Sequence, residues 1–145
     1  MMVEQDTIRL LRECDAGIKM GVKSIDDVEK FVKSGTMKKL LNDSKDEHKR
    51  LEKEVEDMLD NYGDDGKDPN PIAKGMSWMK TNVKLSMNQS DKTVADLMTD
   101  GCNMGVKSLS GYLNQYEAAS EKSKDIAKKL IAVEANLCES MRAYL

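Results

Sequence analysis

The stretch GIKMGVKSI at residues 17–25 returns as GCNMGVKSL at residues 101–109, 84 positions later. A second pair of similar stretches follows, SKDEHKRL at 44–51 and SKDIAKKL at 123–130, which are 79 positions apart. Because a helical segment recurs together with its partner segment, the sequence predicts a duplicated helical hairpin. The duplication constrains the fold strongly, since both hairpins must bury equivalent apolar faces against each other.

The composition is typical of an all-α protein. Charged residues make up 34% of the 145 residues, aromatic residues only 4%, and the two prolines, Pro69 and Pro71, stand together. Chains rich in Lys, Glu, Met and Leu with almost no proline favour helices. This length suits one domain with a substantial core, so we expect a single domain over residues 1–145.

The net charge and the number of cysteines indicate which binding partners and which cellular compartment to expect. The net charge of −3 and the lack of a basic stripe argue against nucleic acid as the main partner. The N-terminal residues are acidic where a signal peptide would be basic, and no apolar run approaches the roughly 18 residues of a membrane span. An odd number of cysteines at unrelated spacings favours reduced thiols, so we expect a cytoplasmic protein that does not bind membranes.

Apolar residues at steps of three and four predict four long helices, over about 6–32, 37–62, 90–117 and 120–145. Gly35 suits the left-handed position that ends the first helix. Ser44 to Glu47 can form a capping box, so the second helix begins either near residue 37 or only at Ser44. The second helix has the most regular apolar stripe, formed by Met37, Leu41, Ser44, His48, Leu51, Val55, Met58 and Tyr62.

Residues 63–89 are predicted to connect hairpin one (about 6–62) to hairpin two (about 90–145). GDDGKDPNP at 63–71 is an obvious loop. A helical pattern with Met76, Met79 and Val83 on one side follows over 72–87. A sixteen-residue helix spans about 24 Å, which together with its flanking loops can cross from one end of a bundle to the other. A four-helix bundle with one long crossover is the ferritin-like arrangement.

The two MGVKS segments, the first-helix sequence CDAGIKMGVKSI and the crossover resemble an uncharacterised ferritin-like four-helix-bundle family of bacteria, one of those described only as domains of unknown function. The resemblance covers nearly the whole chain in architecture. It implies the fold and leaves the activity open.

A ferritin-like metal centre needs a Glu from each of two helices and a Glu-x-x-His motif from each of the others. His48 is the single histidine, and the residue three before it is Lys45. The 79-residue repeat puts Lys124 and Ala127 at the matching places of the last helix. Both motifs are therefore missing, and we expect neither a metal nor another cofactor, with His48 as a weak candidate for an atypical site.

The same repeat spacing places Glu134 seven residues from the bundle centre and about 20 Å from Asp15, too far to share a metal. His48 is then expected to be a buried polar residue. It would bond either to Ser44 or to the partner hairpin.

Four repeated glycines, Gly17, Gly21, Gly101 and Gly105, lie inside the predicted helices. Each costs about 1 kcal/mol of helix stability relative to alanine, so each pair needs a compensating role. Close packing of the first helix against the third is one explanation. A groove for a second subunit or a ligand is the other.

Met20 and its repeat Met104 raise a related question. Met20 falls on the helix face opposite Val22, close to Phe31, which is unusual for a solvent face. Either the crossover helix covers this surface, or Met20 and Phe31 contact a second copy or another protein. Eleven methionines and three cysteines could also bind Cu(I), although methionine is commonly an adaptable core residue.

No catalytic constellation is apparent, and the sequence favours a non-catalytic structural or protein-interaction module that forms a homo-oligomer or binds a protein partner. The alternative is an iron, manganese or copper homeostasis or stress protein with an atypical metal site.

Overall fold

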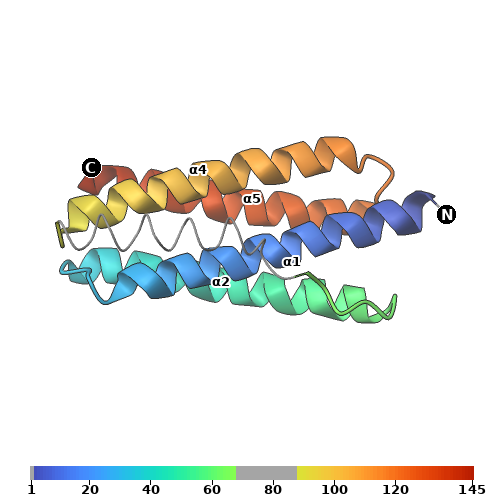
Figure 1. Cartoon of the computed structure of the whole chain (residues 1–145), viewed down its shortest axis with the longest axis horizontal. Coiled ribbons are helices and arrows are strands. Elements are labelled where there is room, and N and C mark those ends of the chain that lie inside the picture. The colour runs from blue at the N-terminus through green and yellow to red at the C-terminus, as the bar shows by residue number, and fades with distance from the viewer. Residues whose placement is uncertain (1, 68–87) are drawn as a thin grey trace.

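The computed structural model describes residues 2–67 and 88–145, and within them the chain is all-α (Figure 1). The long helices are α1 (Met2–Glu29), α2 (Gly35–Asp60), α4 (Asp91–Gln115) and α5 (Glu121–Met141), and a short 3₁₀ helix, η1 (Arg142–Tyr144), follows α5. The prediction of an all-α four-helix bundle is confirmed. The predicted crossover helix over 72–87 lies outside the described residues.

Neighbouring helices of the bundle are antiparallel. Helix α1 packs against α2 and α4, and α5 packs against the same two helices while also contacting α1 across the bundle. The α1–α2 turn and the α4–α5 turn lie at opposite ends, as do the two termini (Figure 1). Hydrogen bonds fix both ends of the α1–α4 pair, because Asp6 accepts from the backbone of Ala118 and Asp91 accepts from that of Ser34.

Serine caps define the starts of α2, α4 and α5, three of the four long helices in the described residues. Ser34, Ser90 and Ser120 each accept a hydrogen bond from the backbone N–H three residues further on, the standard way to satisfy a free donor at a helix N-terminus. Gly35 is therefore the first residue of α2, and the prediction of a left-handed Gly35 at the end of α1 is wrong. The alternative start of α2 at Ser44 is also wrong.

The apolar stripe predicted for α2 is confirmed over most of its length. Its last turn differs, because Leu59 is buried whereas Met58 is half-buried and Tyr62 is 39% exposed. A straight helix has 3.6 residues per turn, so a stripe counted at 3.5 drifts away from the core over several turns. The buried residues of α2 are Met37, Leu41, Ser44, His48, Leu51, Val55 and Leu59.

The buried apolar residues form two clusters, one toward each end of the bundle. The cluster near the α1–α2 turn contains, among others, Ile25, Val28, Met37, Leu41, Met98 and Leu137. The cluster toward the α4–α5 turn contains, among others, Leu10, Ile18, Leu51, Val55, Leu109 and Leu130. His48 and Glu134 belong to neither cluster and lie between them, so a polar layer divides the core.

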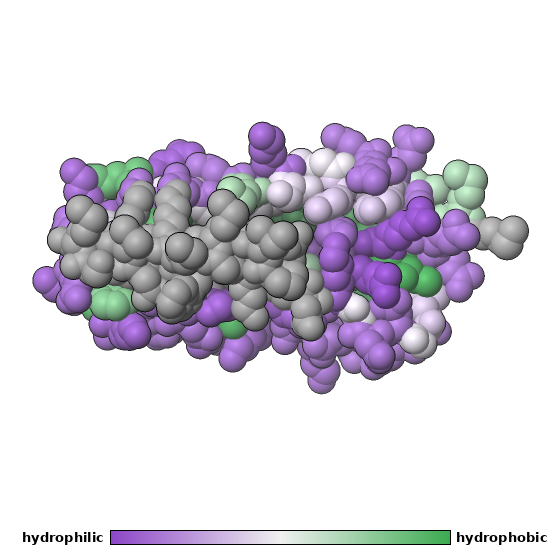
Figure 2. Space-filling view, viewed as in Figure 1, coloured by the Kyte–Doolittle hydropathy of each residue, from purple (hydrophilic) through white to green (hydrophobic). Residues whose placement is uncertain are grey.

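The face shown in Figure 2 is predominantly hydrophilic where the described residues are visible, with isolated apolar patches toward the ends. Among the described residues, no helix combines the length and apolar character that a membrane crossing requires.

Candidate functional site at the bundle centre

His48 and Glu134 make the central contact of the bundle. The Nε2 atom of His48, on α2, lies 2.8 Å from Oε1 of Glu134 on α5. The Nδ1 atom of the same ring lies 2.7 Å from the backbone carbonyl oxygen of Ser44. Both groups are withdrawn from solvent, with His48 0% and Glu134 7% exposed. Both ring nitrogens are thus engaged, and the protonated imidazole can donate to both partners at once.

The surroundings of His48 favour its charged form. Burial by itself would lower the pKa of His48, but the hydrogen bond to Glu134 and the charge of that carboxylate outweigh it, so the pKa is raised above the ordinary value. The carbonyl of Ser44 adds to the rise. A protonated His48 facing an ionised Glu134 is a buried, hydrogen-bonded ion pair.

Gly21 on α1 makes room for this pair. A Cβ atom at Gly21 would lie 2.7 Å from Nε2 of His48 and 3.2 Å from Oε1 of Glu134. Gly105, its repeat on α4, approaches Glu134 from the other side, where a Cβ atom would lie 3.4 Å from the carboxyl carbon. The first distance is incompatible with a real side chain, and the second is an ordinary van der Waals contact, so only Gly21 is required to be glycine at this site.

The other repeated glycines have different surroundings. A Cβ atom at Gly17 would contact Leu109 and Leu130 at 3.9 and 4.0 Å, which is ordinary packing. At Gly101 it would meet nothing within 4 Å. The predicted packing of α1 against α4 is present. The shortest of these Cβ distances, however, are at Gly21, and they are to His48 on α2 and Glu134 on α5 rather than to α4.

The structure corrects the position of Glu134. His48 pairs with a residue 86 positions away, whereas the 79-residue repeat matched His48 with Ala127. The difference is one heptad, which preserves the helix face but shifts α5 by about 10 Å along its axis. The placement of Glu134 seven residues from the centre is therefore wrong. Because α2 and α5 are antiparallel, Leu41 shares one end of the core with Leu137 and Met141, and Leu51 and Val55 share the other with Ala127 and Leu130.

The three cysteines are free and buried. Burial, reinforced by the charges of Glu13 and Asp15, raises the pKa of Cys14 to about 12. Burial and the nearby Glu134 raise the pKa of Cys102 as well. The thiols of Cys14 and Cys102 therefore stay protonated at neutral pH, which makes them poor nucleophiles and poor ligands for a soft metal.

A groove between α1 and α4 reaches this centre. It has a volume of about 650 Å³, and Gly17, Gly21, Gly101 and Gly105 all line it. His48 and Glu134 belong to the same lining. The groove thus lies where the repeated glycines of α1 and α4 contribute no side chains.

The three apolar candidates lie at two places in the structure. Met20 is half-buried and Met104 is 69% exposed, and both line the groove. Phe31 is partly buried against the cluster near the α1–α2 turn, and the ammonium group of Lys30 lies 5.2 Å from its ring centre. The groove thus brings Met20 and Met104 together, whereas Phe31 is not part of its lining.

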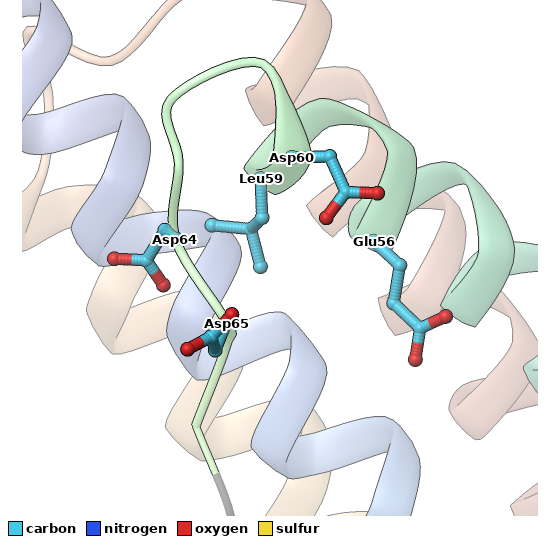
Figure 3. Close-up of a pocket in the computed structure, with 5 residues that line it drawn as sticks. All are labelled: Glu56, Leu59, Asp60, Asp64 and Asp65. Atoms are coloured by element: carbon cyan, nitrogen blue, oxygen red, sulfur yellow. The ribbon is translucent and has the colours of Figure 1, made fainter.

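A second, smaller cavity of about 160 Å³ lies at the end of α2 (Figure 3). Its lining is acidic, but the carboxylates of Glu56 and Asp60 point away from those of Asp64 and Asp65 in Figure 3. Asp64 is already paired with Arg12, whose Nε lies 3.2 Å away. In the part of the chain that the structure describes, no three His, Cys, Asp or Glu side chains converge as metal ligands would.

Comparison of the chain with protein-family models, with curated proteins and with solved structures finds no match. The candidate site therefore rests on the geometry of its own residues.

Replacing Gly21 by alanine tests the close packing at the centre. The added methyl group must displace the His48 ring, which two hydrogen bonds hold, and such overpacking costs about 1–3 kcal/mol. Gly111→Ala is the matched control, because it gives the same gain in helix propensity at an exposed position of α4 where no described atom lies within 4 Å. We expect the free energy of unfolding of Gly21→Ala, measured by urea denaturation, to lie about 1–3 kcal/mol below that of Gly111→Ala. Equal stability of the two variants would contradict the packing described here.

The buried pair also predicts a pH dependence of stability. Since folding raises the pKa of His48, the folded chain holds a proton that the unfolded chain releases near the ordinary pKa of about 6.5. The stabilising contribution is complete below that pH and is lost as the pH rises through the folded pKa. The free energy of unfolding should fall across this window, with a slope of at most about 1.4 kcal/mol per pH unit for one proton. Glu134→Gln removes the partner charge, and its denaturation curves should show no such fall.

Proposed function

We propose that this protein is a non-catalytic structural or protein-interaction module, a ferritin-like bundle with a duplicated hairpin and a crossover helix but without a di-metal centre. The observation that carries the proposal is the His48–Glu134 pair. It occupies the centre of the bundle, and it uses both nitrogens of the one imidazole in the chain. A ligand to iron or manganese would need one of those nitrogens free.

The helices facing the pair support the same proposal. A ferritin-like centre takes a carboxylate from each of two helices and a Glu-x-x-His motif from each of the other two. Here α1 and α4 present Gly21 and Gly105 to the centre. Helix α2 carries Lys45 three residues before His48, and α5 carries Ile131 three residues before Glu134. The volume that a metal and its carboxylates would fill is taken by the ion pair and its close contact with Gly21.

One observation favours the alternative, an atypical metal site. The Cys102 thiol is close enough to Glu134 for that carboxylate to raise its pKa, so Cys102, Glu134 and His48 share one region of the core. Iron, manganese or copper could bind there only by breaking the His48–Glu134 hydrogen bond and deprotonating Cys102. Both steps oppose binding.

Metal titration separates the two proposals. Protein purified without chelator, then titrated with Fe(II), Mn(II) and Cu(I) and analysed for metal content after desalting, should retain less than about 0.1 equivalent of each metal, since binding must first break a buried pair. His48→Gln, which keeps a hydrogen-bonding side chain, should retain no less metal than the parent. One tight equivalent in the parent that is lost in both His48→Gln and Cys102→Ser would overturn the first proposal and support the alternative.

We further propose that the module self-associates through the surface of α4 around Met104. Met104 is a large apolar side chain that lines the α1–α4 groove and is still 69% exposed, as interface residues commonly are. The parent should then have about twice the monomer mass of 16.3 kDa by light scattering.

Met104→Glu should return the mass to that of the monomer, because dimerisation would bury an unpaired charge. Gly111→Glu is a control, since it adds the same charge at another exposed position of α4. A parent that is monomeric at tens of micromolar would exclude self-association through Met104.

A further inference from the structure

The groove between α1 and α4 is an apolar surface that the described residues do not fill. Its walls are formed mainly by aliphatic and methionine side chains, among them Met20, Val28, Leu97, Met98 and Leu109. Its floor holds the charged pair of His48 and Glu134. An apolar groove of about 650 Å³ that is left open to water favours an occupant that covers its hydrocarbon.

The chain itself enters this groove at Lys67. Asp15 accepts a hydrogen bond from the backbone N–H of Lys67 at 3.0 Å, and the Lys67 ammonium group lies 2.5 Å from Oε1 of Glu13. Gly66 makes this approach possible, since it has a φ of +87° and a Cβ there would lie 2.3 Å from Oδ2 of Asp15. The loop after α2 is therefore held against α1 at the level of Asp15, and Lys67 is part of the groove lining.

The chain leaves at the opposite end of the groove. Ser90 caps α4, and Asp91 accepts hydrogen bonds from the backbone N–H groups of Lys33 and Ser34 at the α1–α2 turn. The two points where the described chain breaks off and resumes therefore lie at the level of Asp15 and beside the α1–α2 turn. Fourteen residues of α1 separate Asp15 from the end of the helix at Glu29, which is about 21 Å, and the turn to Ser34 adds to this distance.

Residues 68–87 match this path in length and in pattern. Twenty residues are about 30 Å long when helical. Their sequence places Ile72, Met76, Met79 and Val83 at helical steps of three and four, which gives one apolar face. The segment also carries three lysines and one aspartate, so its opposite face is polar.

We propose that the α1–α4 groove is the docking surface for residues 68–87 of the same chain, with their apolar face over the His48–Glu134 pair. The inference rests on the crossover helix of the proposed fold and adds where that helix docks. The tether favours this occupant over a second copy, because a segment joined to both ends of the groove has a high effective concentration there.

Native-state proteolysis tests the docking on the full chain. Lys74, Lys80 and Lys84 are trypsin sites within the segment, and docking should protect them. Gly101→Glu places a carboxylate in the groove without a clash in the bundle and should speed cleavage within 68–87 about tenfold or more. Gly111→Glu makes the same change on the same helix outside the groove lining, and its cleavage rate should equal that of the parent.

A second variant acts from the side of the segment. Met79→Glu should raise the cleavage rate as Gly101→Glu does, and the double variant should be no faster than either single variant, because both remove one interaction. Thermal denaturation followed by circular dichroism verifies that the bundle remains folded in each variant. Emission from Trp78, the single tryptophan, should shift to longer wavelength when docking is lost.

Three results would overturn the proposal. In the first, the parent is cleaved within 68–87 as fast as Gly101→Glu. In the second, Gly111→Glu has the same effect as Gly101→Glu. In the third, protection rises with protein concentration, which would make a second copy the occupant. None of these results bears on metal content, so the docking and the metal-free function can fail separately.

Discussion

The hydrogen-bonded pair of His48 and Glu134 is the constraint on which the rest of the bundle depends. Its two charges lie where the core would otherwise be continuous hydrocarbon, so each requires the other. If α5 slid by one heptad against α2, His48 would face Ala127 or Met141, and Glu134 would lose its partner. An uncompensated buried charge costs about 3–5 kcal/mol, whereas a slipped aliphatic contact costs far less. The pair therefore selects one register among several that the apolar pattern alone permits.

This selection explains the surroundings of the pair. The imidazole and the Glu134 carboxylate lie directly against α1. They fit there because Gly21 has no side chain. The carbonyl of Ser44 then accepts from the other ring nitrogen and fixes the orientation of the ring. With the centre occupied in this way, the apolar residues separate into two clusters, each of which packs at its own end of the bundle.

The sequence could predict the helices and their inward faces because local rules govern both. Apolar spacing along α2 and serine caps such as Ser90 operate within one or two turns. The register of α5 could not be predicted in the same way, because a shift of seven residues leaves every inward face unchanged. The SKD stretches at 44 and 123 resemble each other in sequence and match His48 with Ala127, but His48 faces Glu134, one heptad further along α5. Gly35 was misplaced for a related reason, since a glycine beside a turn can end one helix or begin the next, and only the Ser34 cap decides between them.

The repeated glycines that leave room for the polar pair also make one wall of the bundle thin. Gly17, Gly21, Gly101 and Gly105 all lie on the α1–α4 side, so this side has the least side-chain volume between the pair and the surface. A bundle with larger side chains at these positions would bury its centre by itself, but Gly21 could not be enlarged without a clash with His48. The two points where the chain is held, Lys67 against Asp15 and Asp91 against Ser34, stand at the two ends of that wall. The polar centre and the thin side of the bundle thus follow from one requirement, to fit an ion pair beside α1 without a clash.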